Sequence, residues 1–122
     1  MLIPLLVVRD IPQALAFYTG VLDFALALAT PEDAPFYAVL TRGADELHLN
    51  RAFGSVPPGH ASAIVVCDDV DALFAAFVAR GLSVPTRADS PVHVAPLDQS
   101  WGTREVYVDD PDGNTLVFQQ RR

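Results

Sequence analysis

Hydrophobic and polar positions follow the same order twice along the chain, because residues 65–73 echo residues 7–15. Each copy has an apolar run, then an acidic helix start, then apolar residues at helical spacing. In the first copy Asp10 is suited to the N-cap position of a helix. Pro12 is suited to the first turn, because proline has no backbone N–H and the N–H groups of the first turn have no partner within the helix. In the second copy three aspartates lie at the positive end of the helix dipole: Asp68, Asp69 and Asp71. The repeat predicts two helices, each following an apolar strand.

After each helix the pattern changes to the period of two that is typical of strands. Two pairs of strands are predicted, at residues 36–40 with 46–49 and at residues 104–108 with 115–118. The first pair turns around Gly43. The second pair turns through residues 109–114, where Pro111 and Gly113 suit the backbone angles of a turn.

The chain therefore divides into two modules of strand, helix and three strands (βαβββ), at about residues 1–53 and 60–120. Residues 54–59 are rich in glycine and proline, as expected for a linker. A chain of 122 residues has the length of one domain, so both modules are assigned to a single domain, residues 1–122. Two curved half-sheets packed side by side predict an α+β fold with a concave cleft.

The charge balance and the single cysteine narrow the classes of partner and compartment. The chain has 8 basic and 15 acidic residues and a formal net charge of −7, so no nucleic acid partner is expected. The same charge serves solubility and can attract a cationic small molecule. Because Cys67 is the only cysteine, the chain cannot form an internal disulfide, and this is typical of proteins of the reducing cytoplasm. The apolar start lacks the basic flank of a signal peptide, and no run reaches the roughly 18 residues of a membrane span, so no membrane partner is expected.

Three segments resemble the signatures of a known superfamily. The opening, residues 4–24, places Pro4 ahead of Asp10, and the closing segments, residues 99–105 and 110–114, contain a Trp-Gly pair and the run Asp-Pro-Asp-Gly-Asn. Over essentially the whole chain these residues resemble the vicinal-oxygen-chelate superfamily of glyoxalases, bleomycin resistance proteins and dioxygenases. The resemblance is closest to the bleomycin-resistance branch. It implies a concave-cleft fold of two βαβββ modules and a homodimer.

Enzymes of this superfamily bind a divalent metal through four side chains, and the resemblance places these positions at Ile3, His48, Ser62 and Val117. Only His48 has a side chain suited to coordination. A shift of two residues along one strand adds His60, which gives two histidines and no carboxylate. We therefore expect no metal and no cofactor, and favour a protein that is not an enzyme. A metal-dependent lyase or dioxygenase acting through His48 and His60 is the alternative.

Other catalytic patterns are also missing from the sequence, which has no glycine-rich phosphate loop, no Gly-x-Ser-x-Gly motif and no Cys-x-x-Cys motif. Four serines show no arrangement of histidine and aspartate nearby: Ser62, Ser83, Ser90 and Ser100. His93 is interpreted as a strand or edge residue without a partner. We therefore expect no nucleophilic catalysis.

A cleft without catalytic groups predicts a binding protein. The resemblance implies a homodimer that sequesters an antibiotic, or another planar or cationic ligand, in grooves at the dimer interface. Such a ligand would stack on an indole and be attracted by acidic groups. The expected ligand-binding residues are Trp101, Phe36, Tyr37, His48 and Arg104. An orphan domain that binds an ordinary metabolite is a further alternative.

Alternation along the strands predicts where some of these side chains point. His48 lies between Leu47 and Leu49, so it faces the cleft if the leucines face the helices. Of Phe36 and Tyr37, one faces the cleft and the other is expected in the core. Six acidic residues can supply negative charge to the cleft: Glu32, Asp33, Asp45, Glu46, Asp98 and Glu105. Ala27 and Leu28 replace the acidic and aromatic residues of the branch, so ligands other than bleomycin fit equally well.

Overall fold

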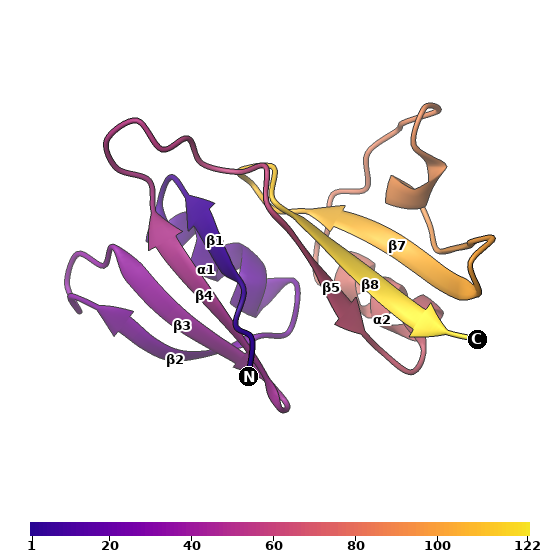
Figure 1. The fold of residues 1–122 in the computed structure, drawn as a ribbon, viewed down its shortest axis with the longest axis horizontal. Coiled ribbons are helices and arrows are strands. Elements are labelled where there is room, and N and C mark those ends of the chain that lie inside the picture. Colours follow the sequence, from indigo (N-terminus) through magenta and orange to yellow (C-terminus); the bar gives the residue numbers. More distant parts are fainter. The chain divides into compact units, whose positions relative to one another are not determined.

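The computed structural model describes all 122 residues, which form two compact units. The first comprises Met1–Ala61 with Asp110–Asn114, and the second comprises Ser62–Asp109 with Thr115–Arg122. The first unit contains β1 (Leu5–Val8), α1 (Ile11–Gly20), β2 (Ala25–Thr30), β3 (Tyr37–Arg42) and β4 (Asp45–Arg51) (Figure 1). The second contains β5 (Ser62–Val66), α2 (Val70–Ala79), the 3-10 helix η1 (Pro91–His93), β6 (Leu97–Asp98), β7 (Thr103–Asp109) and β8 (Thr115–Arg121).

The first unit is a four-stranded sheet with the order β1-β4-β3-β2, and α1 covers one face of it (Figure 1). The predicted N-cap is confirmed, because the Asp10 side chain accepts a hydrogen bond from the Gln13 N–H at 2.8 Å. Alternate strand residues point toward the helix and are buried: Leu6, Val8, Ala38, Leu40, Leu47 and Leu49. The burial of Leu47 and Leu49 confirms that His48 lies on the opposite, open face.

The turn Asp110–Asn114 belongs to the first unit and is tied to it by polar contacts. The buried Tyr18 hydroxyl donates to Asp110 Oδ2 at 2.9 Å, and Asn114 Nδ2 donates to the Val7 carbonyl at 3.0 Å. Gly59 has φ +83°, and a Cβ at this position would lie 2.2 Å from the Asp112 carbonyl oxygen. Only glycine fits this close approach.

The Tyr18–Asp110 contact makes the stability of the protein sensitive to alkaline pH. Burial, and then the neighbouring Asp110 carboxylate, raise the pKa of Tyr18 above its ordinary value. The folded chain therefore holds the phenol proton more tightly than the unfolded chain does. This stabilisation is complete below the ordinary tyrosine pKa of about 10 and is lost as the pH rises above it. Urea unfolding between about pH 8 and 11 is expected to show a falling free energy, with a shallower fall in Tyr18→Phe. Equal slopes for the two proteins would contradict this assignment.

The second unit repeats the design, with the sheet order β5-β8-β7-β6 and α2 over one face (Figure 1). Asp69, one of the three aspartates at the predicted helix start, caps α2 by accepting from the Ala72 N–H at 3.0 Å. The rings of Phe77 on α2 and Phe118 on β8 pack edge to face with centroids 4.9 Å apart. One expectation was wrong: His93 lies at the end of η1 and not in a strand. Pro91 at the start of the 3-10 helix favours this turn over an extended backbone.

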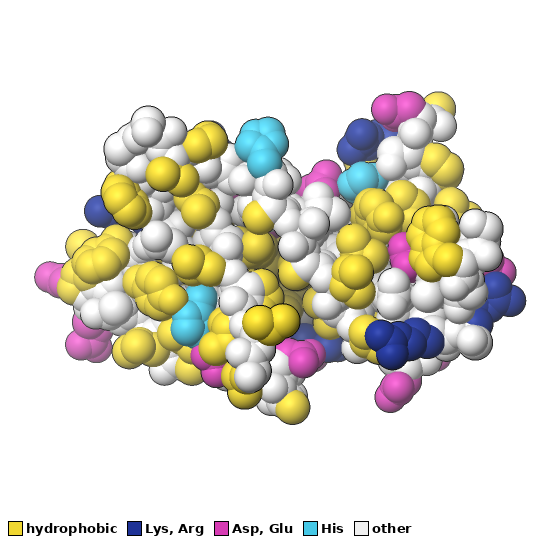
Figure 2. Space-filling view, viewed as in Figure 1, with side chains coloured by type: hydrophobic (Ala, Val, Ile, Leu, Met, Phe, Trp, Pro, Cys, Tyr) yellow, Lys and Arg dark blue, Asp and Glu magenta, His cyan; other side chains and the backbone are white.

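In each unit the sheet face opposite the helix is open and carries exposed apolar side chains. Its half-exposed or more exposed members are Leu5 and Leu28 in the first unit and Ile64 and Val66 in the second. Figure 2 shows the open faces with hydrophobic side chains gathered over the strands. Neither α1 nor α2 is long and apolar enough to cross a membrane. The open faces are thus the places where the fold presents apolar surface to a ligand or a partner.

Candidate ligand-binding site

An exposed indole is held in a fixed position on the second unit. Trp101 lies in the turn between β6 and β7, and 63% of its surface is exposed. Its Nε1–H donates a hydrogen bond of 3.1 Å to Oε2 of Glu105. The indole is therefore anchored at its polar edge while much of its surface stays accessible. This arrangement suits stacking on a planar ligand.

Glu105 is the polar centre of this region, on the open face of β7, and is only 2% exposed. Its Oε2 also accepts from Thr103 Oγ1 and from Gln119 Nε2, each at 2.7 Å. Burial by itself raises the pKa of Glu105, but the hydrogen bonds from Thr103, Gln119 and Trp101 outweigh it and hold the pKa below its ordinary value. The carboxylate therefore stays negatively charged at neutral pH beside the indole. We call Trp101, Thr103, Glu105 and Gln119 the Trp101 cluster.

The open face of the first unit brings together Tyr37, His48 and Glu46. The Tyr37 hydroxyl is hydrogen-bonded to Nδ1 of His48, and Nε2 of the same ring lies 2.5 Å from Oε2 of Glu46. Because an ionised carboxylate can only accept, Nε2 carries the ring proton and Nδ1 accepts from the tyrosine. The strand register places His48 between Leu5 on β1 and Val39 on β3. The result is a polar chain bordered by apolar side chains.

The two other expected binding residues have different surroundings. Phe36 immediately precedes β3 and is 49% exposed, so the expectation that one of the two aromatics lies in the core was wrong. An aromatic just before a strand is not subject to the alternation of the strand. Arg104 lies on the face of β7 opposite Glu105, where it donates to both Asp71 carboxylate oxygens at 2.8 and 2.9 Å and to Asp98 at 3.1 Å.

The ion pair with Asp71 connects Arg104 on β7 to helix α2. The hydrogen bonds that Arg104 donates to Asp71, and then to Asp98, raise the pKa of Arg104, and the same bond to Arg104 lowers the pKa of Asp71. The donors of its guanidinium are thus directed at carboxylates of its own unit. The structure brings Tyr37 and His48 together in the first unit, places Phe36 beside them in sequence, and places Trp101 in the second unit.

The positions that hold a metal in enzymes of the superfamily do not fit one here. Ile3 and Val117 offer no ligand atom, and the two ring nitrogens of His48 are engaged with Tyr37 and Glu46. Nowhere in the chain do three or more His, Cys, Asp or Glu side chains form a group that could hold a metal ion.

The structure also reveals two arrangements that the sequence pattern did not predict. Gln119 on β8 lies opposite Glu105 on β7 in the register, which explains how three donors meet at one carboxylate oxygen. The expectation that no serine has a histidine and an aspartate nearby was wrong. Ser90 Oγ lies 2.6 Å from His93 Nδ1, and His93 Nε2 lies 3.2 Å from Asp109 Oδ1. The spacing of Ser90 and His93 was visible in the sequence, whereas the contact with Asp109 arises from the packing of η1 on β7.

Comparison with known proteins identifies the family. Residues 3–118 match the model of the glyoxalase/bleomycin resistance protein/dioxygenase superfamily, and the chain belongs to this superfamily. Its architecture of two four-stranded sheets and two α-helices is the α+β vicinal-oxygen-chelate fold. No match was found among curated proteins.

Several solved structures share the fold over nearly their whole length. A bleomycin resistance determinant encoded on the transposon Tn5 is 25% identical, with a TM-score of 0.80 over 100% of this chain and 98% of that one. A bleomycin-binding protein from Streptomyces verticillus, in complex with copper(II)-bleomycin, is 27% identical, with a TM-score of 0.75 over 99% and 95% of the two chains. A bleomycin-binding protein in complex with bleomycin is 23% identical, with a TM-score of 0.80 over 100% and 98%. All three share the fold of this chain at low sequence identity.

Proposed function

We propose that this protein binds a planar, cationic small molecule reversibly and does not transform it, as an antibiotic-sequestering protein of the bleomycin-resistance type would. The observation that carries the proposal is the Trp101 cluster, in which an exposed indole is fixed by a buried, charged carboxylate. The indole supplies a stacking surface for a flat ring, and the Glu105 carboxylate favours positive charge nearby. Both features are needed to distinguish such a ligand from neutral apolar molecules.

The solved structures that share the fold support this choice of ligand class. Two of them, at 25% and 27% identity, are a bleomycin resistance determinant and a bleomycin-binding protein. Ala27 and Leu28 stand where the bleomycin-resistance branch has an acidic and an aromatic residue. The proposed ligand class therefore includes other planar cations as well as bleomycin. The formal net charge of −7 favours the approach of any cation.

The open face of the first unit offers a second proposed binding surface. Phe36 and Tyr37 offer further aromatic contact, and His48 is held by Tyr37 and Glu46 so that its ring stays in one orientation. We further propose that two copies of the chain associate as a homodimer and cover the exposed apolar side chains of the open faces, and that the ligand lies in a groove formed with the second copy. The presence of one cysteine is consistent with action in the reducing cytoplasm.

Substituting Glu105 with glutamine tests the role of charge in this proposal. The amide keeps the size of the side chain and can still accept a hydrogen bond, but it removes the negative charge. We expect Glu105→Gln to weaken binding of bleomycin about tenfold, a loss of about 1.4 kcal/mol, because the attraction between the carboxylate and a nearby cation is lost. Isothermal titration calorimetry of the two proteins measures the difference.

Asp89→Asn is the matched control, because it changes the net charge equally at a side chain that is 79% exposed and lies outside the Trp101 cluster. Its affinity is expected to remain at the wild-type value. Equal weakening by both substitutions would assign the effect to net charge alone. Unchanged binding by Glu105→Gln would remove the carboxylate from the proposed site.

A further inference from the structure

A serine, a histidine and an aspartate form a hydrogen-bonded chain in the second unit. Ser90 immediately precedes η1, His93 ends it, and Asp109 ends β7. Ser90 Oγ lies 2.6 Å from Nδ1 of His93, and Nε2 of His93 lies 3.2 Å from Oδ1 of Asp109. The carboxylate is fixed in turn by a hydrogen bond of 2.7 Å from Thr115 Oγ1. None of these residues belongs to the Trp101 cluster.

The two hydrogen-bond partners of the His93 ring determine which ring nitrogen carries the proton, and this arrangement activates the serine. An ionised carboxylate only accepts hydrogen bonds, so the contact with Asp109 places the ring proton on Nε2. Nδ1 is then unprotonated and accepts from the Ser90 hydroxyl. A serine hydroxyl that donates to a histidine oriented by a carboxylate is the arrangement that generates a nucleophile in serine hydrolases, here with the two ring nitrogens exchanged.

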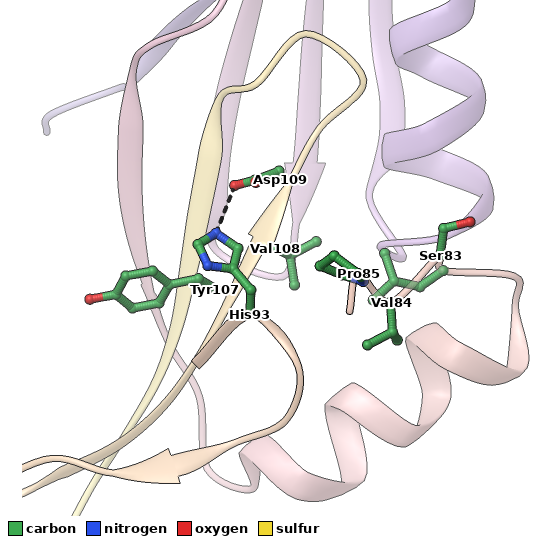
Figure 3. Close-up of a pocket in the computed structure, with 8 residues that line it drawn as sticks. Ser83, Val84, Pro85, His93, Tyr107, Val108 and Asp109 are labelled. Carbon is green, nitrogen blue, oxygen red and sulfur yellow. Dashed lines mark hydrogen bonds and ion pairs between the residues drawn. The ribbon is translucent and has the colours of Figure 1, made fainter. Parts of the chain in front are cut away.

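The histidine and the aspartate also border a pocket of about 180 Å³. The apolar part of its wall comes from Leu82, Val84, Pro85 and Val108, and Tyr107 completes it. Figure 3 shows the His93 ring beside Tyr107, with a dashed line for the hydrogen bond between the imidazole and Asp109. The ring centroids of His93 and Tyr107 are 5.5 Å apart. The pocket thus has room for a small apolar acyl group next to the base.

We propose that Ser90 is a nucleophile that becomes acylated by small activated esters, with His93 as the general base and Asp109 as its orienting partner. The inference rests on the hydrogen-bonded chain together with the adjoining pocket. It goes beyond ligand sequestration, since the acyl group is retained through a covalent bond.

The proposed step balances with the ester as the only co-reactant. Ser90 Oγ attacks the carbonyl carbon, and its proton moves to His93 Nδ1 while the carbonyl electron pair shifts to oxygen. Asp109 stabilises the imidazolium that forms. Collapse of the tetrahedral intermediate breaks the bond to the leaving alkoxide, which takes the proton from Nδ1. The products are acyl-Ser90, neutral His93 and an alcohol.

Reaction of the intact protein with p-nitrophenyl acetate tests the proposal. We expect a burst of one p-nitrophenol per chain and one acetyl group on Ser90 in peptide mass spectrometry. Ser90→Ala is expected to abolish the burst. His93→Gln is expected to slow acetylation by about 100-fold or more, the usual contribution of a general base. Asp109→Asn is expected to act similarly, because an amide can donate to Nε2 and move the ring proton to Nδ1.

Ser55→Ala is the matched control, since Ser55 is an exposed serine of the first unit and does not line this pocket. Its burst is expected to equal that of the wild-type protein. Circular dichroism of each variant verifies the fold. Acetylation of Ser90 in the wild-type chain no faster than that of Ser55 would overturn the proposal without any variant. Undiminished acetylation of folded His93→Gln would also overturn it.

Discussion

Replacing Trp101 with alanine is expected to weaken binding of a planar cationic ligand about thirtyfold, a loss of about 2 kcal/mol. The substitution removes the stacking surface, and it removes one of the three donors to Glu105 Oε2. Tryptophan side chains in binding sites commonly contribute this much when truncated. Calorimetric titration of both proteins with bleomycin measures the change. Because Trp101 is the single tryptophan, the wild-type titration can also be followed by its fluorescence.

Two further variants separate the contributions of the ring and its anchor. Trp101→Phe retains an aromatic face but not the N–H that binds Glu105, so its affinity is expected to fall between those of the wild type and Trp101→Ala. Phe53→Ala removes an aromatic ring that is 68% exposed and lies in the first unit, outside the Trp101 cluster. This control is expected to bind like the wild type. Wild-type affinity in Trp101→Ala would refute the proposed site.

The largest expected effect on stability comes from Asp110→Ala, which should lower the free energy of unfolding by about 3 kcal/mol or more. The Asp110 side chain is 6% exposed and accepts from the Tyr18 hydroxyl, the Asn114 side-chain amide and two backbone N–H groups. Tyr18 is fully buried, so its hydroxyl would be left without its partner and without water. Leaving buried donors unpaired is costly because folding has already removed their hydration. Chemical denaturation followed by circular dichroism measures the loss.

Asp89→Ala provides the comparison for this prediction. Its carboxylate is 79% exposed and lies 3.7 Å from Arg87, so its loss is expected to change stability by less than about 0.5 kcal/mol. A similar loss in both variants would show that removing a negative charge, and not the buried network, determines the effect. Wild-type stability of Asp110→Ala would show that water replaces the carboxylate.

The helices and their starts could be predicted from the sequence because the signals are local. Asp10 and Asp69 each cap a helix by bonding to an N–H three residues later, which depends on no distant part of the chain. The alternation around His48 was equally local and placed its side chain correctly. The two-residue strand β6 and the 3-10 helix η1 are too short for a periodic pattern. Both elements are defined by their contacts with β7, and these contacts cannot be predicted from the residues of the short elements alone.

The chemical partners of the site residues were harder to predict for the same reason. Trp101 was recognisable as an exposed aromatic in a polar turn, but its anchor depends on how that turn folds back onto Glu105. Arg104 has the chemistry of a ligand contact, and the structure instead directs it toward Asp71, far away in the sequence. The chain from Ser90 to Asp109 likewise requires η1 to lie against the end of β7. Sequence patterns fix the face of a side chain more readily than the atom it binds.

The central claim, reversible binding of a planar cationic ligand, is tested most directly by calorimetric titration of the wild-type protein with metal-free bleomycin and a small panel of planar cationic drugs. We predict saturable binding of at least one of these ligands, with one ligand per chain and recovery of the unchanged ligand after denaturation of the protein. The absence of heat and of any change in Trp101 fluorescence across the whole panel would contradict the claim, as would chemical conversion of the ligand during the titration.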